Sequence, residues 1–266
     1  MKARINGIDL AYEVVGDGVP LLWVHGYPLD RTIWRSQTEG LANCARHIVP
    51  DLRGFGESDA PDGVYAMDLM AEDLHALLGS LSIKRAVVAG LSMGGYIALA
   101  FARRYPDSLA ALILADTRPG PDSAEAAKTR LDAADRAERE GVAPVVEPMV
   151  GKLLSPATMA RRPDLVDSLR RLLLSSRPKG VAGALRGMAA RPDATPLLKT
   201  IQAPALVVTG ADDAIIPPAE ARKLAAEIPD SVLVEIPDAG HLPNLEQPQA
   251  FNEAVRRFLE GLERHD

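Results

Sequence analysis

Short apolar runs alternate with amphipathic stretches through most of the 266-residue chain. Apolar runs rich in β-branched residues are typical of buried strands, whereas apolar residues recurring about every three to four positions are typical of helices. This alternation predicts a mostly parallel sheet whose strands are joined by crossover helices. The predicted strands are residues 8–15, 20–25, 47–51, 85–90, 109–116, 205–210 and 232–236. The predicted helices between them are residues 34–43, 67–80, 92–105, 219–227 and 248–262.

The alternation stops between residues 118 and 199, where helical patterns follow one another without a strand-like run. We therefore expect a helical cap at 118–199, inserted between two strands and dividing the core into residues 1–117 and 200–266. Near the amino-terminal end, Asn6-Gly7 is a turn signal that predicts an antiparallel hairpin at the sheet edge. The helices predicted within the cap are residues 123–140, 144–154, 163–174 and 179–188.

Composition places the chain among ordinary globular proteins, with 47% hydrophobic and 25% charged residues and a net charge of −6. No segment approaches the about 18 apolar residues of a membrane span, and the negative charge argues against nucleic-acid or anionic-membrane partners. The single cysteine, Cys44, cannot form an internal disulfide, and residues 1–7 lack the apolar core of a leader peptide. These observations favour a cytoplasmic protein that acts as a monomer or small homo-oligomer.

The cap is more basic than the rest of the chain. Residues 118–199 hold 15 Lys and Arg against 10 Asp and Glu, a net charge of +5. Such a positively charged surface favours anionic substrates. Basic side chains on the solvated outer faces of the helices are the alternative explanation for the net charge of the cap.

A Gly90-x-Ser92-x-Gly94 step follows one of the apolar runs directly and precedes a predicted helix. A sharp turn from strand to helix places its central side chain on an exposed tip, above the positive end of the helix dipole. Glycines are needed at the flanking positions because a Cβ there would collide with the facing strand or helix. The pattern therefore makes Ser92 the candidate nucleophile.

A serine nucleophile needs a histidine base and an acid that orients the histidine. Of the five histidines, His25 and His241 lie where a predicted strand ends. Serine hydrolases with a strand-turn-helix nucleophile have the order serine, acid, histidine, which favours His241.

Four aspartates are candidates for the acid: Asp116, Asp212, Asp213 and Asp238. Asp238 is too near His241 to form a separate arm of the site, whereas Asp213 lies in a loop after the penultimate predicted strand. We predict Asp213 as the acid, with Asp116 and Asp212 as the alternatives.

These motifs together resemble the α/β-hydrolase superfamily over essentially the full chain, most closely its small bacterial carboxylesterases. 3-Oxoadipate enol-lactonases and cofactor-free haloperoxidases or perhydrolases share much of the pattern. The matching motifs are His25-Gly26-Tyr27-Pro28, the glycine turn at residues 51–58, Gly90-x-Ser92-x-Gly94, Gly210-x-x-Asp213-x-x-x-Pro217 and Gly240-His241.

The resemblance implies an α/β-hydrolase fold with a mostly parallel eight-stranded sheet and a helical cap. It also implies a serine carboxylesterase that hydrolyses short-chain carboxylic esters through an acyl-enzyme on Ser92, with Asp213 and His241 completing the catalytic triad. The backbone N–H groups of Tyr27 and Met93 form the expected oxyanion hole, and Tyr27, Trp34 and Met93 the expected substrate pocket. His25 is expected to organise its loop.

We expect a small-molecule ester substrate and no cofactor. The sequence contains no His-Glu-x-x-His or paired Cys-x-x-Cys motif, so no metal is expected either. Dehalogenases and epoxide hydrolases of this fold attack with an aspartate where this chain has Ser92, which disfavours both.

Other functions remain open: a lactonase of the 3-oxoadipate enol-lactonase type, a perhydrolase or haloperoxidase, or a ligand receptor that kept the hydrolase fold. A lactonase acting on anionic substrates needs a cation at the site, for which Arg53 or Arg118 is the candidate. A structural role in the glycine turn is the alternative for Arg53.

Overall fold

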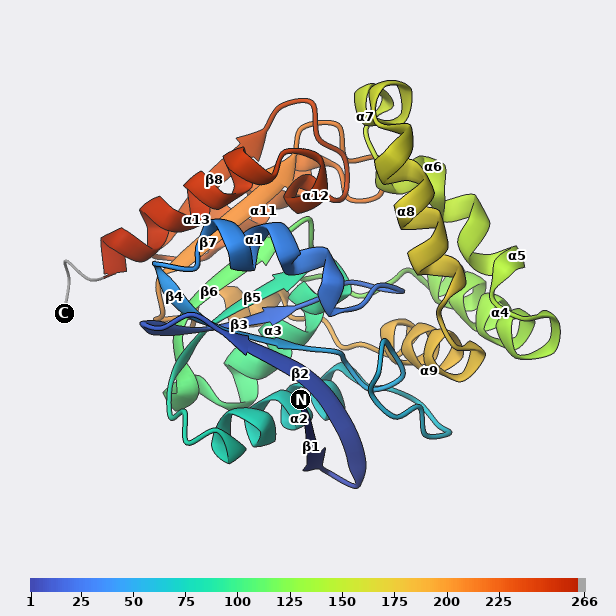
Figure 1. The fold of residues 1–266 in the computed structure, drawn as a ribbon, viewed down its shortest axis with the longest axis horizontal. Helices are drawn as coiled ribbons and strands as arrows, with labels where there is room; N and C mark the ends of the chain where they lie inside the picture. Colours follow the sequence, from blue (N-terminus) through green and yellow to red (C-terminus); the bar gives the residue numbers. More distant parts are fainter. Residues whose placement is uncertain (263–266) are drawn as a thin grey trace.

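The computed structural model describes residues 1–262, whose eight strands form one sheet in the order β1-β2-β4-β3-β5-β6-β7-β8 (Figure 1). The strands are β1 (Lys2–Ile5), β2 (Ile8–Val15), β3 (Val19–Val24), β4 (Ala45–Pro50), β5 (Ala86–Leu91), β6 (Leu109–Ala115), β7 (Ala205–Gly210) and β8 (Ser231–Ile236). The pairs β1·β2 and β2·β4 are antiparallel, and all other pairs are parallel. The prediction of a mostly parallel eight-stranded sheet is confirmed, and so is the edge hairpin, in which Ile5 pairs with Ile8.

Helices connect the parallel strands and cover both faces of the sheet. Those of the core are α1 (Arg35–Gly40), α2 (Met67–Ser80), α3 (Met93–Arg104), α11 (Pro218–Glu227), α12 (Pro243–Glu246) and α13 (Pro248–Leu262), with 3-10 turns η1 (Arg31–Trp34) and η2 (Pro106–Ser108). Between β6 and β7 lie α4 (Ala124–Glu140), α5 (Ala143–Val146), η3 (Glu147–Met149), α6 (Val150–Leu153), α7 (Pro156–Arg161), α8 (Pro163–Leu174), α9 (Pro178–Ala189) and α10 (Thr195–Leu198).

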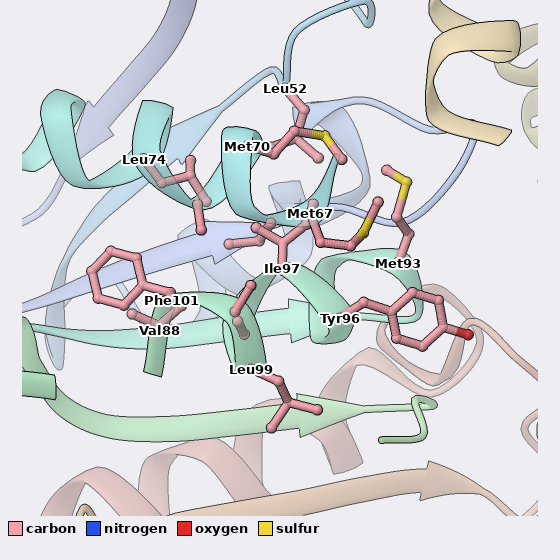
Figure 2. Packing of buried hydrophobic residues seen from close by; sticks show 14 of the residues in the cluster. Leu52, Met67, Met70, Leu74, Val88, Met93, Tyr96, Ile97, Leu99 and Phe101 are labelled. Carbon is pink, nitrogen blue, oxygen red and sulfur yellow. The ribbon is translucent and has the colours of Figure 1, made fainter. Parts of the chain in front are cut away.

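The core forms two apolar layers because successive side chains of a strand point to opposite faces of the sheet. In β3, Leu22 and Val24 belong to the layer that α2 and α3 cover, while Leu21 and Trp23 belong to the layer beneath α1 and α13. Figure 2 shows the first layer, with Ile97 of α3 next to Met67 of α2. Burial on both faces explains why these strands are apolar along their whole length.

The chain between β6 and β7 is helical throughout, as expected for the cap. Figure 1 shows α4 to α8, coloured yellow-green to olive, grouped on one side of the sheet. The exact limits of a cap at 118–199 and of core parts at 1–117 and 200–266 stay a prediction. Among residues 1–262, every helix is too short or too polar to cross a bilayer.

Several predicted helices differ from the structure where proline or a cap residue decides their ends. The helix predicted at 144–154 is interrupted, since Pro148 lacks the N–H that a continuous helix needs. The helix predicted at 34–43 is a 3-10 turn capped by Asp30 followed by a short α-helix. Between the helices predicted at 144–154 and 163–174, the structure has a further short helix, α7, which Ser155 caps and whose first turn holds Pro156.

Candidate active site

Ser92 lies at the tip of a sharp turn between β5 and α3. Its backbone dihedrals are φ 54° and ψ −114°, a left-handed conformation that non-glycine residues rarely adopt. A Cβ on Gly90 would collide with the carbonyl of Gly94, and one on Gly94 with the carbonyl of Val24. The two glycines therefore permit the turn, and Ser92 stays partly exposed while Leu91 and Met93 on either side are buried.

The end of β6 fixes the nucleophile turn from one side. The N–H of Ser92 donates to the carbonyl of Ala115 at 2.9 Å, and the hydroxyl of Thr117 donates to the carbonyl of Ser92 at 2.8 Å. Asp116, between these two contacts, is therefore held close to the nucleophile turn.

The loop after β3 packs against the other side of the turn. A Cβ on Gly26 would lie 2.9 Å from Cδ2 of Leu91, 3.1 Å from its carbonyl oxygen and 3.3 Å from the Cβ of Ser92, so glycine allows the closest approach of this loop. Nδ1 of His25 lies 2.9 Å from the carbonyl of Gly26, and the N–H of Leu52 donates to its Nε2 at 3.0 Å. Burial lowers the pKa of His25, which favours the neutral ring that both contacts require. His25 thus organises this loop, as expected.

Met93, the first residue of α3, directly follows Ser92, and Tyr27 directly follows Gly26, which approaches Ser92 closely. Within residues 1–262, the N–H group of neither Met93 nor Tyr27 donates a hydrogen bond to a loop or side-chain acceptor. Two free N–H groups beside a nucleophile are what an oxyanion hole requires.

Asp213 and His241 come from the loops after β7 and β8 and form a buried pair. Nδ1 of His241 lies 2.7 Å from Oδ2 of Asp213, and the side chains are 3% and 0% exposed. The second carboxylate oxygen accepts from the N–H groups of Ile215 at 2.8 Å and Ile216 at 3.0 Å. These contacts fix the carboxylate and favour the histidine tautomer whose Nε2 is free to accept a proton.

The structure distinguishes between the three aspartates that the sequence left as candidates for the acid. Asp213 contacts His241, whereas Asp212 is exposed. Asp116 is 1% exposed, and one of its oxygens lies with an oxygen of Asp213 and a ring nitrogen of His241 within 4.8 Å of one another. This is the one cluster of potential metal ligands among residues 1–262, but the acid–base contact already uses Nδ1 of His241.

Ser92 follows β5 and His241 follows β8, and both lie at the same edge of the sheet, with the ends of β6 and β7 between them. Within the described part of the chain, the Ser92 hydroxyl makes no hydrogen bond of ordinary geometry. Catalytic hydrogen bonds are often long without substrate and shorten when it binds.

The three predicted pocket residues do not lie together. Tyr27 and Met93 belong to the layer of α2 and α3, and Met93 lies at the start of α3 near Tyr96 (Figure 2). Trp34 instead fills the opposite layer, with its ring 4.6 Å from that of Trp23 and 1% of its surface exposed. The structure therefore places Trp34 in the core, away from Tyr27 and Met93, because large aromatic rings also serve to fill the space between helix and sheet.

The hydroxyl of Tyr27 is buried and has no hydrogen-bond partner among residues 1–262. Burial raises the pKa of Tyr27, and the nearby positive charge of Arg130 on α4 opposes the rise. Tyr27 therefore keeps its proton and is available as a donor facing the cap.

Both candidate substrate-binding cations are paired with carboxylates. Arg53 forms a two-point contact with Asp73 at 2.6 and 2.7 Å, and both side chains are buried. Arg118 donates to Asp122 at 2.8 Å and is 34% exposed. Arg53 thus has the structural role that the sequence left open, and Arg118 retains a partly exposed side chain.

The sequence gives no indication of Glu246, a buried carboxylate that joins the cap to the base loop, which is the segment after β8 that contains Gly240 and His241. It accepts from the N–H of Gly240 and from the N–H of Ser155, both at 2.7 Å. The N–H of His241 also donates to the carbonyl of Leu153 at 3.1 Å. No local sequence signal marks Glu246, because one of its partners is 91 residues away.

Comparison with known proteins places the chain among hydrolases of this fold. A family model described as the alpha/beta hydrolase fold matches residues 19–248. A solved thermophilic esterase from Thermogutta terrifontis, with malate bound, is 48% identical, covers 98% of each chain and has a TM-score of 0.96. The enol-lactonase from Burkholderia xenovorans is 30% identical over 98% of this chain and 100% of its own, with a TM-score of 0.91. 3-Oxoadipate enol-lactonase 2 from Acinetobacter baylyi is 30% identical over 95% of this chain and 93% of its own.

Proposed function

Because the chain belongs to the alpha/beta hydrolase fold family, we propose that it is a serine carboxylesterase acting on short-chain carboxylic esters. The observation that carries the proposal is the buried contact between Asp213 and His241 at the sheet edge where Ser92 occupies its strained turn. A charged acid held against a neutral histidine supplies the base that a serine hydroxyl needs.

In the proposed reaction, Ser92 attacks the ester carbonyl while His241 Nε2 accepts the hydroxyl proton. The carboxylate of Asp213 stabilises the imidazolium, which then protonates the leaving alcohol. This step leaves an acyl-enzyme on Ser92. Water, deprotonated by His241, releases the acid and restores the hydroxyl.

The N–H groups of Tyr27 and Met93 are proposed to stabilise the oxyanion that forms in each half-reaction. Their freedom from other hydrogen bonds supports this role, and so does the place of Met93 directly after Ser92 and of Tyr27 directly after Gly26, which packs against Ser92. Such donors act most strongly on charge that develops in the transition state, and each contributes about 3 kcal/mol.

Tyr27 and Met93 are also the proposed lining of the acyl pocket, and Trp34 is not included because its ring is packed in the opposite layer. A pocket built from one aromatic and one methionine side chain beneath the cap favours small acyl groups. We expect kcat/KM for p-nitrophenyl acetate to butyrate to exceed that for decanoate by at least about tenfold, because a few mismatched methylenes give this discrimination.

The proposal is tested with p-nitrophenyl butyrate and a fluorophosphonate probe. Wild type is expected to hydrolyse the ester and to incorporate one label per chain at Ser92. Ser92→Ala is expected to lose at least about 10⁴-fold in kcat and to lose labelling, with an unchanged circular dichroism spectrum. Ser168→Ala, on the exposed face of α8, serves as the matched control and is expected to behave as wild type. Label at another serine would refute the assignment.

The second candidate is an enol-lactonase, which the two enol-lactonase relatives support. A substrate with a free carboxylate requires a cation, and Arg118 is the candidate that remains partly exposed. Much faster turnover of an anionic enol-lactone than of simple esters, lost in Arg118→Gln, would replace the esterase proposal.

A further inference from the structure

Asp116 is a second buried carboxyl next to the acid of the proposed triad, and the reaction as written gives it no role. It follows β6, between the two backbone contacts that hold Ser92, and its own backbone has φ 44°. Its N–H donates to the carbonyl of Val208 on β7 at 3.0 Å. The residue is therefore fixed at the point where the ends of three strands meet.

The two oxygens of Asp116 differ in their surroundings. One accepts from the N–H of Gly210 at 2.9 Å and lies 3.3 Å from the hydroxyl of Thr209. The other is buried and has no donor within residues 1–262. An ionised carboxylate oxygen that is buried without a hydrogen-bond donor destabilises the folded protein. If the same oxygen is protonated, its O–H group can itself donate a hydrogen bond.

The titratable groups that face Asp116 are Asp213 and His241. Two carboxylates this close and this buried do not both ionise, since each charge disfavours the other. Asp213 accepts from two backbone N–H groups and from His241, whereas Asp116 has donors on one oxygen alone. The negative charge therefore resides on Asp213 and the proton on Asp116.

The direction of the pKa of Asp116 agrees with this assignment. Burial raises it well above the ordinary value, and the neighbouring carboxylate of Asp213 raises it further. The N–H of Gly210 opposes the rise without reversing it.

Resting on the proposed function, we propose that Asp116 is a positioning residue that stays a neutral carboxylic acid and donates its proton to the carboxylate of Asp213. This hydrogen bond adds a donor from the end of β6 to the loop N–H groups of Ile215 and Ile216. With these donors together, the Asp213 carboxylate keeps the orientation in which it accepts from His241. Asp116 thereby acts on the histidine through Asp213.

Asp116→Asn and Asp116→Gly test the donor without disturbing the backbone, since both residues tolerate a left-handed φ. An asparagine amide reproduces the neutral acid: its oxygen accepts from Gly210 and its nitrogen donates to Asp213. Asp116→Asn is expected to rescue function, keeping kcat within about threefold of wild type with an unchanged pH profile. Asp116→Gly is expected to lose at least about tenfold in kcat with KM within about twofold, as misplacement of a catalytic group does.

A readout independent of turnover is the downfield proton signal of Nδ1–H in His241, observed by NMR. It is expected to be retained in wild type and Asp116→Asn, and to broaden or shift in Asp116→Gly. This signal reports on the Asp213–His241 contact even in a protein that hydrolyses no ester, so failure of the proposed function is distinguishable from failure of this inference.

Three results would overturn the inference. Equal losses in Asp116→Asn and Asp116→Gly would mean that an ionised Asp116 is required. Wild-type kcat and an unchanged Nδ1–H signal in Asp116→Gly would mean that Asp116 does not position the Asp213 carboxylate. A larger loss in Asp116→Asn than in Asp213→Asn would make Asp116 the acid of the triad.

Discussion

Helices α3 and α4 each follow a strand that ends at the site, but they are built in opposite ways. Ten of the 12 residues of α3 are buried, whereas α4 buries only Ala134 and Ala137 of its 17 residues. The outer face of α4 carries ion pairs one turn apart, such as Lys128 with Asp132. The core side of the site is therefore fixed by backbone and packing, whereas most of α4 in the cap is solvated and is expected to tolerate change.

The largest effect is expected at the acid on the core side. Asp213→Asn is expected to lower kcat by about 10³-fold or more, since an amide favours the wrong histidine tautomer. The neighbouring variant Asp212→Asn changes an exposed side chain and is expected to stay within about twofold of wild type. Steady-state kinetics on p-nitrophenyl butyrate measure both. Similar losses in the two variants would contradict the assignment of the acid.

Glycine substitutions compare the two sides directly through stability. In Gly94→Ala the new Cβ meets the carbonyl of Val24, so the variant is expected to lose about 3 kcal/mol or more of unfolding free energy. Gly151→Ala on α6 has nothing within 4 Å and is expected to gain up to about 1 kcal/mol, because alanine favours helix. Urea unfolding of both variants measures the contrast. Equal destabilisation would show that the cap is as tightly packed as the core.

One buried group of charged side chains in the cap is expected to be sensitive to substitution. The carboxylate of Asp122 is 1% exposed and contacts Arg118, Arg130 and Arg191. Asp122→Asn leaves these guanidinium groups without their anion and is expected to cost about 2–3 kcal/mol in urea unfolding.

The matched control for Asp122→Asn is Asp132→Asn, which removes the exposed partner of Lys128. It is expected to cost no more than about 0.5 kcal/mol. A loss at Asp122 no larger than that at Asp132 would mean that the cap has no buried polar anchor.

The smallest effect is a pH dependence of stability. Burial lowers the pKa of His47, whose Nδ1 accepts from Trp23 at 2.9 Å. Below the ordinary histidine pKa of 6.5 the unfolded chain binds a proton that the folded ring resists, so His47 contributes less stability as the pH falls. The Tm difference between wild type and His47→Gln is therefore expected to shrink from pH 8 to pH 5. A constant difference would show that folding does not change the pKa of His47.

The contrast between the core side and the cap side of the site also explains which parts of the structure can be predicted from the sequence. The nucleophile turn is predictable because its glycines, apolar strand and helix are consecutive in the chain. The strands and α2 match their predicted residues closely for a similar reason, since long periodic segments specify one structure. The choice of Asp213 over Asp212 depends on a motif that fixes the position of the acid in its loop.

Contacts between distant segments are what the sequence does not reveal. Trp34 has the residue type of a pocket wall, and only the fold shows its ring packed on Trp23 and Phe251. The contact of Asp116 with Asp213 depends on the adjacency of β6 and β7. In the cap, Pro148 interrupts a segment whose apolar periodicity predicts one continuous helix, because backbone chemistry overrides the pattern there.

Glu246 links the position of the cap to the position of the loop that carries His241. Its carboxylate is shared between Ser155 of the cap and Gly240, and the next residue, His241, is bonded to Leu153. The place of His241 beside Asp213 therefore depends on backbone groups of the cap as well as on the loops of the core.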